Sequence, residues 1–150
     1  MNTKVMGYLR CTREVVPYMQ DQGWGRIINF SGLTARQSGS VVGSMRNVAV
    51  AAMTKNLADE LGPHAINVTV VHPGLTRTER TADMVSEQAS QQGITIEEAE
   101  RRMVQGISLR RMIDAQEIAY VVAFLASPKS MAINGDAIAV AGGSGRAIYY

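Results

Sequence analysis

Two uncharged polar side chains, Ser31 and Asn47, are the first candidates for binding a small ligand in this sequence. Ser31 comes directly after Arg26–Phe30, a short stretch with β-branched residues at its centre. Ligands of open α/β sheets bind beyond the carboxyl ends of the strands. The Ser31 hydroxyl therefore either contacts a ligand or satisfies backbone groups in the turn that follows. The Asn47 amide either hydrogen-bonds a hydroxyl group of a ligand or lies on a solvated or interface face.

A second group of candidates follows the next apolar stretch, Ile66–Val71. There Pro73 ends the extended run because proline removes a donor from the ladder. Gly74 permits close approach of the backbone to a ligand, and Thr78 offers a hydroxyl. The two histidines have no obvious partners within reach in the sequence, so neither a metal site nor a nucleophilic triad is predicted.

Apolar side chains at three- and four-residue spacing predict the helices that position these groups. One helix is expected over residues 3 to 21 and a second over residues 43 to 61. Asp114 is expected to cap a last helix, which ends before Pro128. Helices of this length, placed between short apolar stretches, indicate crossovers that connect parallel strands.

The segment from residue 79 to residue 106 differs from the rest of the chain because it is polar. It contains one short charged helix, Ile96–Met103, and no diagnostic motif. We expect it to form a surface lid. No internal repeat and no linker divides the chain, so residues 1–150 are expected to form a single domain.

Three strands are predicted, over residues 26–30, 66–71 and 136–140. Helices and strands alternate, which favours an α/β fold with a parallel sheet covered by helices. A parallel sheet needs cover on both faces and protection at its edges. Three strands leave one flank of residues 26–30 without an obvious partner, which suggests further elements upstream.

Composition limits the classes of function. The 150 residues are 46% apolar and 19% charged, with a formal net charge of +2, so neither disorder nor an electrostatic nucleic-acid footprint is indicated. The single cysteine, Cys11, forms no internal disulfide, and the first ten residues lack the apolar core of a signal peptide. No apolar run approaches the roughly 18 residues of a membrane span. A cytoplasmic protein that binds neither nucleic acid nor membrane is expected.

Five segments in register carry a resemblance to a known family. They are Pro17-Tyr18-Met19, Gly25–Ser31, Asn47–Gly62, Ile66–Thr78 and Ile133–Gly143. Together they resemble the C-terminal part of the short-chain dehydrogenase/reductase family. The resemblance implies a partial Rossmann-like, doubly wound parallel sheet with three recognisable strands and covering helices. It also implies hydride transfer between a nicotinamide cofactor and a carbonyl or alcohol.

Members of that family use a tyrosine as proton donor or base and a lysine one helical turn later, together with a loop serine and a helix asparagine. The nearby cation lowers the pKa of the tyrosine, which is otherwise near 10. Aligned without gaps, this sequence has Gly43 at the tyrosine position, Asn47 at the lysine position and Lys4 at the asparagine position. The serine position falls on Ser31 or Gly32. The tyrosines of the chain lie elsewhere and are expected to pack in the core or at interfaces.

Carried over by resemblance, the candidate catalytic residue is Ser31, and the candidate cofactor-binding residues are Phe30, Asn47, Pro73, Gly74 and Thr78. No metal ligand is expected. The cofactor is NAD or NADP, and the acidic residue that would distinguish them belongs to a unit absent from this sequence. No G-x-G-x-x-G occurs, and the tail Gly142–Gly145 is interpreted as a flexible turn rather than a phosphate loop.

Three hypotheses remain open. In the first, the chain is an oxidoreductase that supplies the substrate side and half of the nicotinamide side, acts on a small carbonyl or alcohol, and is impaired or inactive by itself. In the second, it is a non-catalytic pseudoenzyme whose helices at 3–21 and 43–61 hold a homo-oligomer together. In the third, it is a truncated fragment. Both of the first two predict a homo-oligomer.

Overall fold

A three-stranded parallel sheet forms the centre of the computed structural model, which describes residues 1–145. Its strands are β1 (Gly25–Phe30), β2 (Ile66–Pro73) and β5 (Ala137–Val140), in the order β1-β2-β5. Phe30 lies opposite Val71 in the β1–β2 register. Helical crossovers join the strands, and the α/β fold class predicted from the sequence is confirmed.

The middle strand, β2, is buried at every position except its last. A strand covered on both faces needs an almost continuous apolar sequence, which β2 has. It runs two residues beyond the predicted end at Val71. Proline is tolerated there because Pro73 follows the last pairing with β1, while Gly74 continues the pairing with β5 by donating to Val140 O (3.0 Å).

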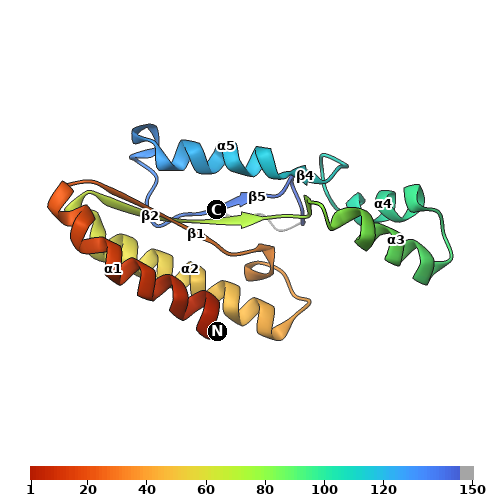
Figure 1. Cartoon of the computed structure of the whole chain (residues 1–150), viewed down its shortest axis with the longest axis horizontal. Coiled ribbons are helices and arrows are strands. Elements are labelled where there is room, and N and C mark those ends of the chain that lie inside the picture. Colours follow the sequence, from red (N-terminus) through yellow and green to blue (C-terminus); the bar gives the residue numbers. More distant parts are fainter. Residues whose placement is uncertain (146–150) are drawn as a thin grey trace.

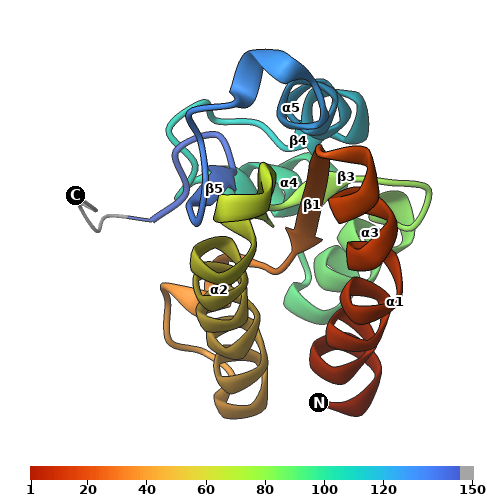
Figure 2. The same cartoon turned by 90° about the vertical axis from the view of Figure 1, so that its left-hand side faces the viewer.

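Helices cover both faces of this sheet (Figure 1). α1 (Gly7–Gln22) and α2 (Val41–Leu61) lie on one face, and α5 (Ala115–Ala126) lies on the other. Figure 2 shows the same two layers from the end of the molecule, with α1 and α2 side by side. The predicted helices are present, but α1 begins at Gly7 rather than at residue 3. α2 begins two residues before its predicted start because the Ser40 hydroxyl accepts the N–H of Gly43 (3.1 Å) and caps the first turn.

The predicted cap of the last helix is also present. Asp114 is the N-cap of α5, and its N–H donates to the Glu117 carboxylate (2.8 Å). At the other end of the chain, a π-helical turn, Asn2–Met6, precedes α1. Turns of this kind are rare and occur often at functional sites. It carries Lys4 to the sheet.

The segment predicted as a polar lid folds into more structure than the sequence indicated. It contains α3 (Thr81–Gln92) and α4 (Ile96–Val104), and it projects from one end of the molecule (Figure 1). A short parallel pair, β3 (Thr76–Arg77) with β4 (Ile113–Asp114), flanks it. The segment has an apolar cluster of its own, made of Val85, Ala89, Ala99, Val104, Ile107 and Met112. Only α4 was expected, because α3 has few apolar residues among its glutamines and serines and so shows no clear helical period. Movement of the segment as a lid stays a prediction.

One edge of the sheet is open. Because the N–H groups of Gly25 and Ser31 donate toward β2, the alternation of the strand turns the peptide groups of Arg26, Ile28 and Phe30 outward. No strand within residues 1–145 pairs with this edge. The expected unpartnered flank of residues 26–30 is thus observed. Within the same residues, none of the helices is both long and apolar enough to span a membrane.

Candidate functional site

The carboxyl end of β1 places Ser31 between β2 and α2. Its N–H donates to Val71 O (2.9 Å), and its hydroxyl donates to the backbone oxygen of Asn47 (3.0 Å). The hydroxyl therefore satisfies a carbonyl of α2, whereas the structural role predicted from the sequence was to satisfy backbone groups in the turn after β1. A catalytic role for Ser31 stays a prediction.

The Asn47 amide is buried, with 4% of its surface exposed. Its Nδ2 donates to the Thr34 hydroxyl (2.5 Å), and its Oδ1 accepts from the Lys4 ammonium (3.3 Å). The expectation of a solvated or interface position is wrong, because both ends of the amide are held by side chains of other segments. A hydrogen bond from Asn47 to a cofactor stays a prediction.

Lys4 is the cation of this site. Its Nζ donates to Ser31 O (3.1 Å) as well as to Asn47 Oδ1, so it links the turn after β1 to α2. Burial lowers the pKa of Lys4, and the positive charge of Arg46 lowers it further. The sequence placed Lys4 at a family asparagine position but gave no reason to expect its contact with Asn47.

His72 is a part of the site that the sequence did not reveal. It is 1% exposed near the end of β2, and its Nδ1 accepts the N–H of Gly32 (3.1 Å). Burial lowers the pKa of His72, and the charges of Arg36 and Lys4 lower it further. A neutral imidazole that accepts at Nδ1 carries its proton at Nε2. The contact joins residues 40 positions apart, so no local pattern could have indicated it.

Gly43 lies buried in the first turn of α2, where the resemblance would place a tyrosine. A Cβ atom at Gly43 would meet the Ser40 side chain at 3.0 Å (Oγ) and 3.1 Å (Cβ). Tyr8 approaches the end of β1 from α1, and its hydroxyl donates to Phe30 O (3.0 Å). No hydrogen bond joins a tyrosine hydroxyl to Ser31, Lys4 or Asn47 within residues 1–145.

The other cofactor candidates are not joined to this cluster by hydrogen bonds within the described chain. A Cβ atom at Gly74 would lie 2.7 Å from Ala141 Cβ, so the close approach at this glycine is to the chain itself. The Thr78 N–H donates to the hydroxyl of Thr81, the first residue of α3 (2.7 Å). Pro73 and Phe30 sit at strand ends, and Phe30 is 37% exposed. Cofactor contacts of all four stay predictions.

The tail glycines, Gly142–Gly145, were interpreted from the sequence as a turn rather than a phosphate loop. Gly142 and Gly143 have positive φ angles of 61° and 78°, and their Cβ positions are filled by Ile113 and Ile107 and by Ser108, respectively. These glycines therefore serve close packing within the chain.

A groove lies beside the turn after β1. It has a volume of about 420 Å³ and is lined by Leu33 and Gln37 from that turn, Leu75 after β2, Met103 and Ile107 near α4, and Ser144. Its walls come from four segments that are distant in the sequence. It lies where open α/β sheets bind their ligands, beyond the carboxyl ends of the strands.

Fold and site together define a class of protein, the Rossmann-like α/β proteins that bind ligands at the carboxyl edge of a parallel sheet. A family model described as enoyl-(acyl carrier protein) reductase matches residues 1–144. The NADPH-dependent reductase BacG of Bacillus subtilis is 32% identical over 147 residues, which are 97% of this chain and 57% of BacG. The short-chain reductase protein NovJ of Streptomyces niveus is 34% identical over 95% of this chain and 53% of NovJ.

The solved structures give the same result. The crystal structure of YwfH, an NADPH-dependent reductase involved in bacilysin biosynthesis, matches with a TM-score of 0.87 and 31% identity over 97% of this chain and 56% of YwfH. The chain belongs to the short-chain dehydrogenase/reductase family. It spans a little more than half the length of the curated relatives that it matches.

Proposed function

We propose that this chain supplies the substrate side and part of the nicotinamide side of a site for NAD(P)-linked hydride transfer between a carbonyl and an alcohol. By itself the chain does not complete that reaction. Family membership supports the class of chemistry, and two similar proteins are described as NADPH-dependent reductases. The groove bordered by Leu33, Leu75 and Met103 is the proposed position of the small carbonyl or alcohol substrate.

Gly43 is the observation that carries the proposal of impaired activity. Hydride transfer to a carbonyl leaves a negative oxygen that must take up a proton, and a phenol beside a cation is suited to give one. The turn that would carry the phenol has a glycine, and Ser40 occupies the space beside it. Lys4, the cation that contacts Asn47, donates to an asparagine and a backbone carbonyl rather than to a phenol.

The cofactor of the complete protein is proposed to be NAD or NADP. Because the described residues lack the glycine-rich turn for the pyrophosphate, dinucleotide binding requires chain beyond the part matched here. The open edge of β1 supports the same conclusion, because a buried parallel sheet is normally paired at such an edge.

The test compares the 150-residue chain with a longer chain that contains an upstream strand-helix unit. NADH and NADPH are titrated into each, with cofactor fluorescence and thermal shift as readouts, and carbonyl reduction is followed by loss of absorbance. The proposal expects binding to the longer chain only. Saturable binding together with carbonyl reduction by the 150-residue chain would contradict it. Failure of the longer chain to bind either nucleotide would favour the non-catalytic alternative.

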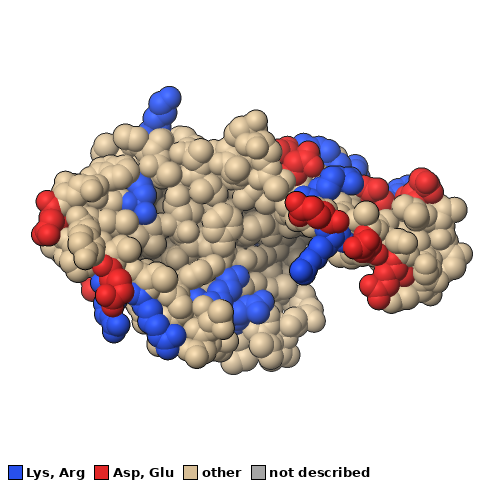
Figure 3. Space-filling model, viewed as in Figure 1, with Lys and Arg blue, Asp and Glu red and all other residues tan. Residues whose placement is uncertain are grey.

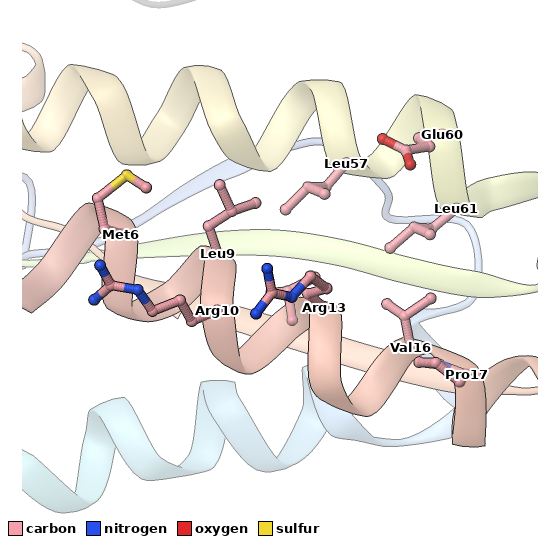
Figure 4. A pocket seen from close by; sticks show the side chains of 10 residues that line it. Met6, Leu9, Arg10, Arg13, Val16, Pro17, Leu57, Glu60 and Leu61 are labelled. Atoms are coloured by element: carbon pink, nitrogen blue, oxygen red, sulfur yellow. The ribbon is translucent and has the colours of Figure 1, made fainter. Parts of the chain in front are cut away.

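A homo-oligomer through α1 and α2 is the second part of the proposal. Val41, Met45 and Val48 recur at helical spacing on α2 and are 78%, 60% and 49% exposed. A groove of about 440 Å³ runs between the two helices, with Leu9 and Leu57 directed toward each other inside it (Figure 4). Apolar patches of this kind mark interaction sites.

We propose that a second copy of this chain covers the groove between α1 and α2, because the groove also carries charges of both signs. Arg10 and Arg13 come from α1, and Glu60 comes from α2 (Figure 4). Around a twofold axis each such surface meets its own copy, so the arginines of one chain can pair with the glutamate of the other. The same interface would serve the non-catalytic alternative.

Light scattering during size-exclusion chromatography tests this interface. The wild-type chain is expected at twice its monomer mass, and Met45→Glu is expected at the monomer mass because it buries a charge in the interface. Met131→Glu is the matched control, since Met131 is 66% exposed but lies after α5, away from α1 and α2. A wild-type chain that is monomeric over the whole accessible concentration range would contradict the proposal.

A further inference from the structure

The distribution of carboxylates in the sequence leaves the Lys4 site without an acidic neighbour. No Asp or Glu occurs in residues 1–13, 22–58 or 61–78. These three stretches supply the start of α1, the whole of β1, the turn that follows it, nearly all of α2 and the whole of β2. The Lys4 site, which consists of Lys4, Ser31, Asn47 and the adjacent Arg46, is built entirely from them.

Figure 3 shows the consequence on one face of the molecule. Asp and Glu gather toward the two ends of this view, whereas the part over the start of α1 and the first turns of α2 shows Lys and Arg without a neighbouring acid. Within residues 1–145, no ion pair includes Lys4 or Arg46. The charges at this site are therefore not neutralised by the described chain.

The hydrogen bonds of Lys4 leave it able to contact a ligand. An ammonium group has three protons to donate, and two of them go to neutral oxygens, Ser31 O (3.1 Å) and Asn47 Oδ1 (3.3 Å). Arg46 adds a second unneutralised cation, and its Nε is buried without a hydrogen-bond partner. A buried donor without an acceptor costs free energy that a suitable acceptor would recover.

Neighbouring cations lower the pKa values of both Lys4 and His72. Arg46 acts on Lys4 to lower its pKa, and Lys4 and Arg36 both lower the pKa of His72. Lys4 and Arg46 are like charges that repel each other in a partly desolvated place, where electrostatic interactions are stronger than in water, whereas the effect on His72 keeps its imidazole neutral. A bound anion would relieve the repulsion between Lys4 and Arg46.

We infer that the Lys4 site binds the anionic group of a ligand, a carboxylate or a phosphate, with Lys4 as the side chain that contacts it and Arg46 as the second cation. The site lies at the carboxyl end of β1, so a ligand held there by its anionic group extends over the ends of β1 and β2. If the proposed hydride transfer holds, this ligand is its substrate, which makes the substrate class an anionic carbonyl or alcohol. Anion binding itself does not depend on that reaction.

Thermal shift measurements with small anions test the inference without any nicotinamide cofactor. Sodium phosphate, sodium succinate and sodium chloride are added to the 150-residue chain at equal ionic strength. At about ten times the dissociation constant, a specific anion is expected to raise Tm by about 3–5 °C more than chloride does. A larger effect of phosphate indicates a phosphorylated ligand, and a larger effect of succinate indicates a carboxylate ligand.

Lysine variants assign the effect to the site. Lys4→Gln is expected to abolish the extra shift, and Lys4→Arg, which keeps the charge, is expected to retain most of it. Lys129→Gln is the matched control, because Lys129 is exposed after α5 and its loss changes the net charge equally. Equal shifts in the wild type and in Lys4→Gln would overturn the inference, as would a wild type that responds to both anions only as it does to chloride.

Amide chemical shifts give a second readout that does not depend on the folding of a variant. Addition of the effective anion to the wild type is expected to move the N–H signals of Gly32 and Asn47 and to leave those of α3 unchanged. Movement confined to other segments would overturn the inference. Because no cofactor is present, this result and the nucleotide titration of the longer chain can fail independently.

Discussion

The ammonium group of Lys4 and the amide of Asn47 meet across 43 positions of the sequence, with 3.3 Å between Nζ and Oδ1. In this chain the cation comes from the turn before α1 and the amide from α2, whereas the family arrangement would place a lysine on the second of these helices. The charge is thus at the carboxyl end of β1, but it reaches that end from the turn before α1 rather than from α2. This arrangement determines what the site can hold.

Removal of the Asn47 side chain should destabilise the chain. Asn47→Ala leaves the Thr34 hydroxyl and the Lys4 ammonium each short of a buried partner, which should lower the free energy of unfolding by about 1–3 kcal/mol. Urea denaturation measures this change in the free energy of unfolding. Asn56→Ala is the control on the same helix, because Asn56 is exposed and should change stability by no more than about 0.5 kcal/mol. Equal effects of the two substitutions would contradict the assigned contacts.

His72 should make stability depend on pH. Its pKa in the folded chain is lowered below the ordinary value of 6.5, so the unfolded chain takes up the proton first as the pH falls. The stabilisation is therefore complete above pH 6.5 and is lost as the pH falls from there through the lower pKa of the folded chain.

Urea denaturation at pH 7.5 and pH 5.5 tests this dependence. His72→Asn keeps an acceptor for the Gly32 N–H but does not titrate, so its stability should change less between the two values. His64→Asn removes the exposed histidine of the loop before β2 and should keep the full wild-type change. A wild-type loss no larger than that of His72→Asn would exclude the assigned role.

Gly74 should be sensitive to substitution even when no cofactor is present. Gly74→Ala places a Cβ atom 2.7 Å from Ala141 Cβ and 2.8 Å from its Cα, which is backbone that cannot move aside easily. Crowding of this kind costs about 1–3 kcal/mol, measurable by thermal or urea unfolding. Gly106→Ala is the control, since no atom lies within 4 Å of its Cβ position. If Gly74→Ala is as stable as the wild type, the packing of Gly74 on Ala141 does not explain the glycine, and its predicted role in cofactor binding becomes the better explanation.

An exchange of side chains at three positions should restore a proton donor in a longer chain that binds the cofactor. Gly43→Tyr introduces the phenol, Asn47→Lys places a cation one turn later, and Lys4→Asn keeps the net charge constant. The cation lowers the pKa of the phenol and so favours proton transfer near neutral pH. Carbonyl reduction should rise at least tenfold over the unexchanged longer chain.

The control for this exchange is Gly43→Phe with the same two partner substitutions. It has nearly the same volume but no hydroxyl, so it separates the chemistry of the phenol from its effect on folding. Circular dichroism confirms that both variants are folded. Equal activity of the tyrosine and phenylalanine variants would show that the position carries no proton donor.

The order of the elements could be predicted from periodicity alone. Continuous burial of β2 requires an apolar run, and the helices around it have apolar residues at three- and four-residue spacing, so α2, α5 and the three sheet strands were expected close to their observed bounds, and α1 was expected four residues too early. α3 was missed because Val85 and Ala89 are its only buried apolar residues, set among glutamines and serines. β3 and β4 have two residues each, too few for any period.

In the candidate site, some residues could be named from the sequence, but their contacts could not. The positions of Ser31 and Asn47 were named from the sequence, because Ser31 directly follows a predicted strand and Asn47 falls at the lysine position of the family helix. Their side-chain partners Lys4 and Thr34 were not, since these reach Ser31 and Asn47 only through the packing of helices on the sheet, and the same holds for the contact of His72 with Gly32. The distances in sequence are too long for a local pattern to encode.

The sequence by itself determined the family, the alternation of helices and strands, and the substitution of the tyrosine position by Gly43, because these depend on residue type and spacing. Only the tertiary structure decided that Lys4 stands against Asn47, that Gly74 packs on Ala141 and that α3 closes an apolar cluster of its own. Each of these depends on which surfaces meet when the helices pack on the sheet, and that is fixed by the burial of side chains from distant parts of the chain.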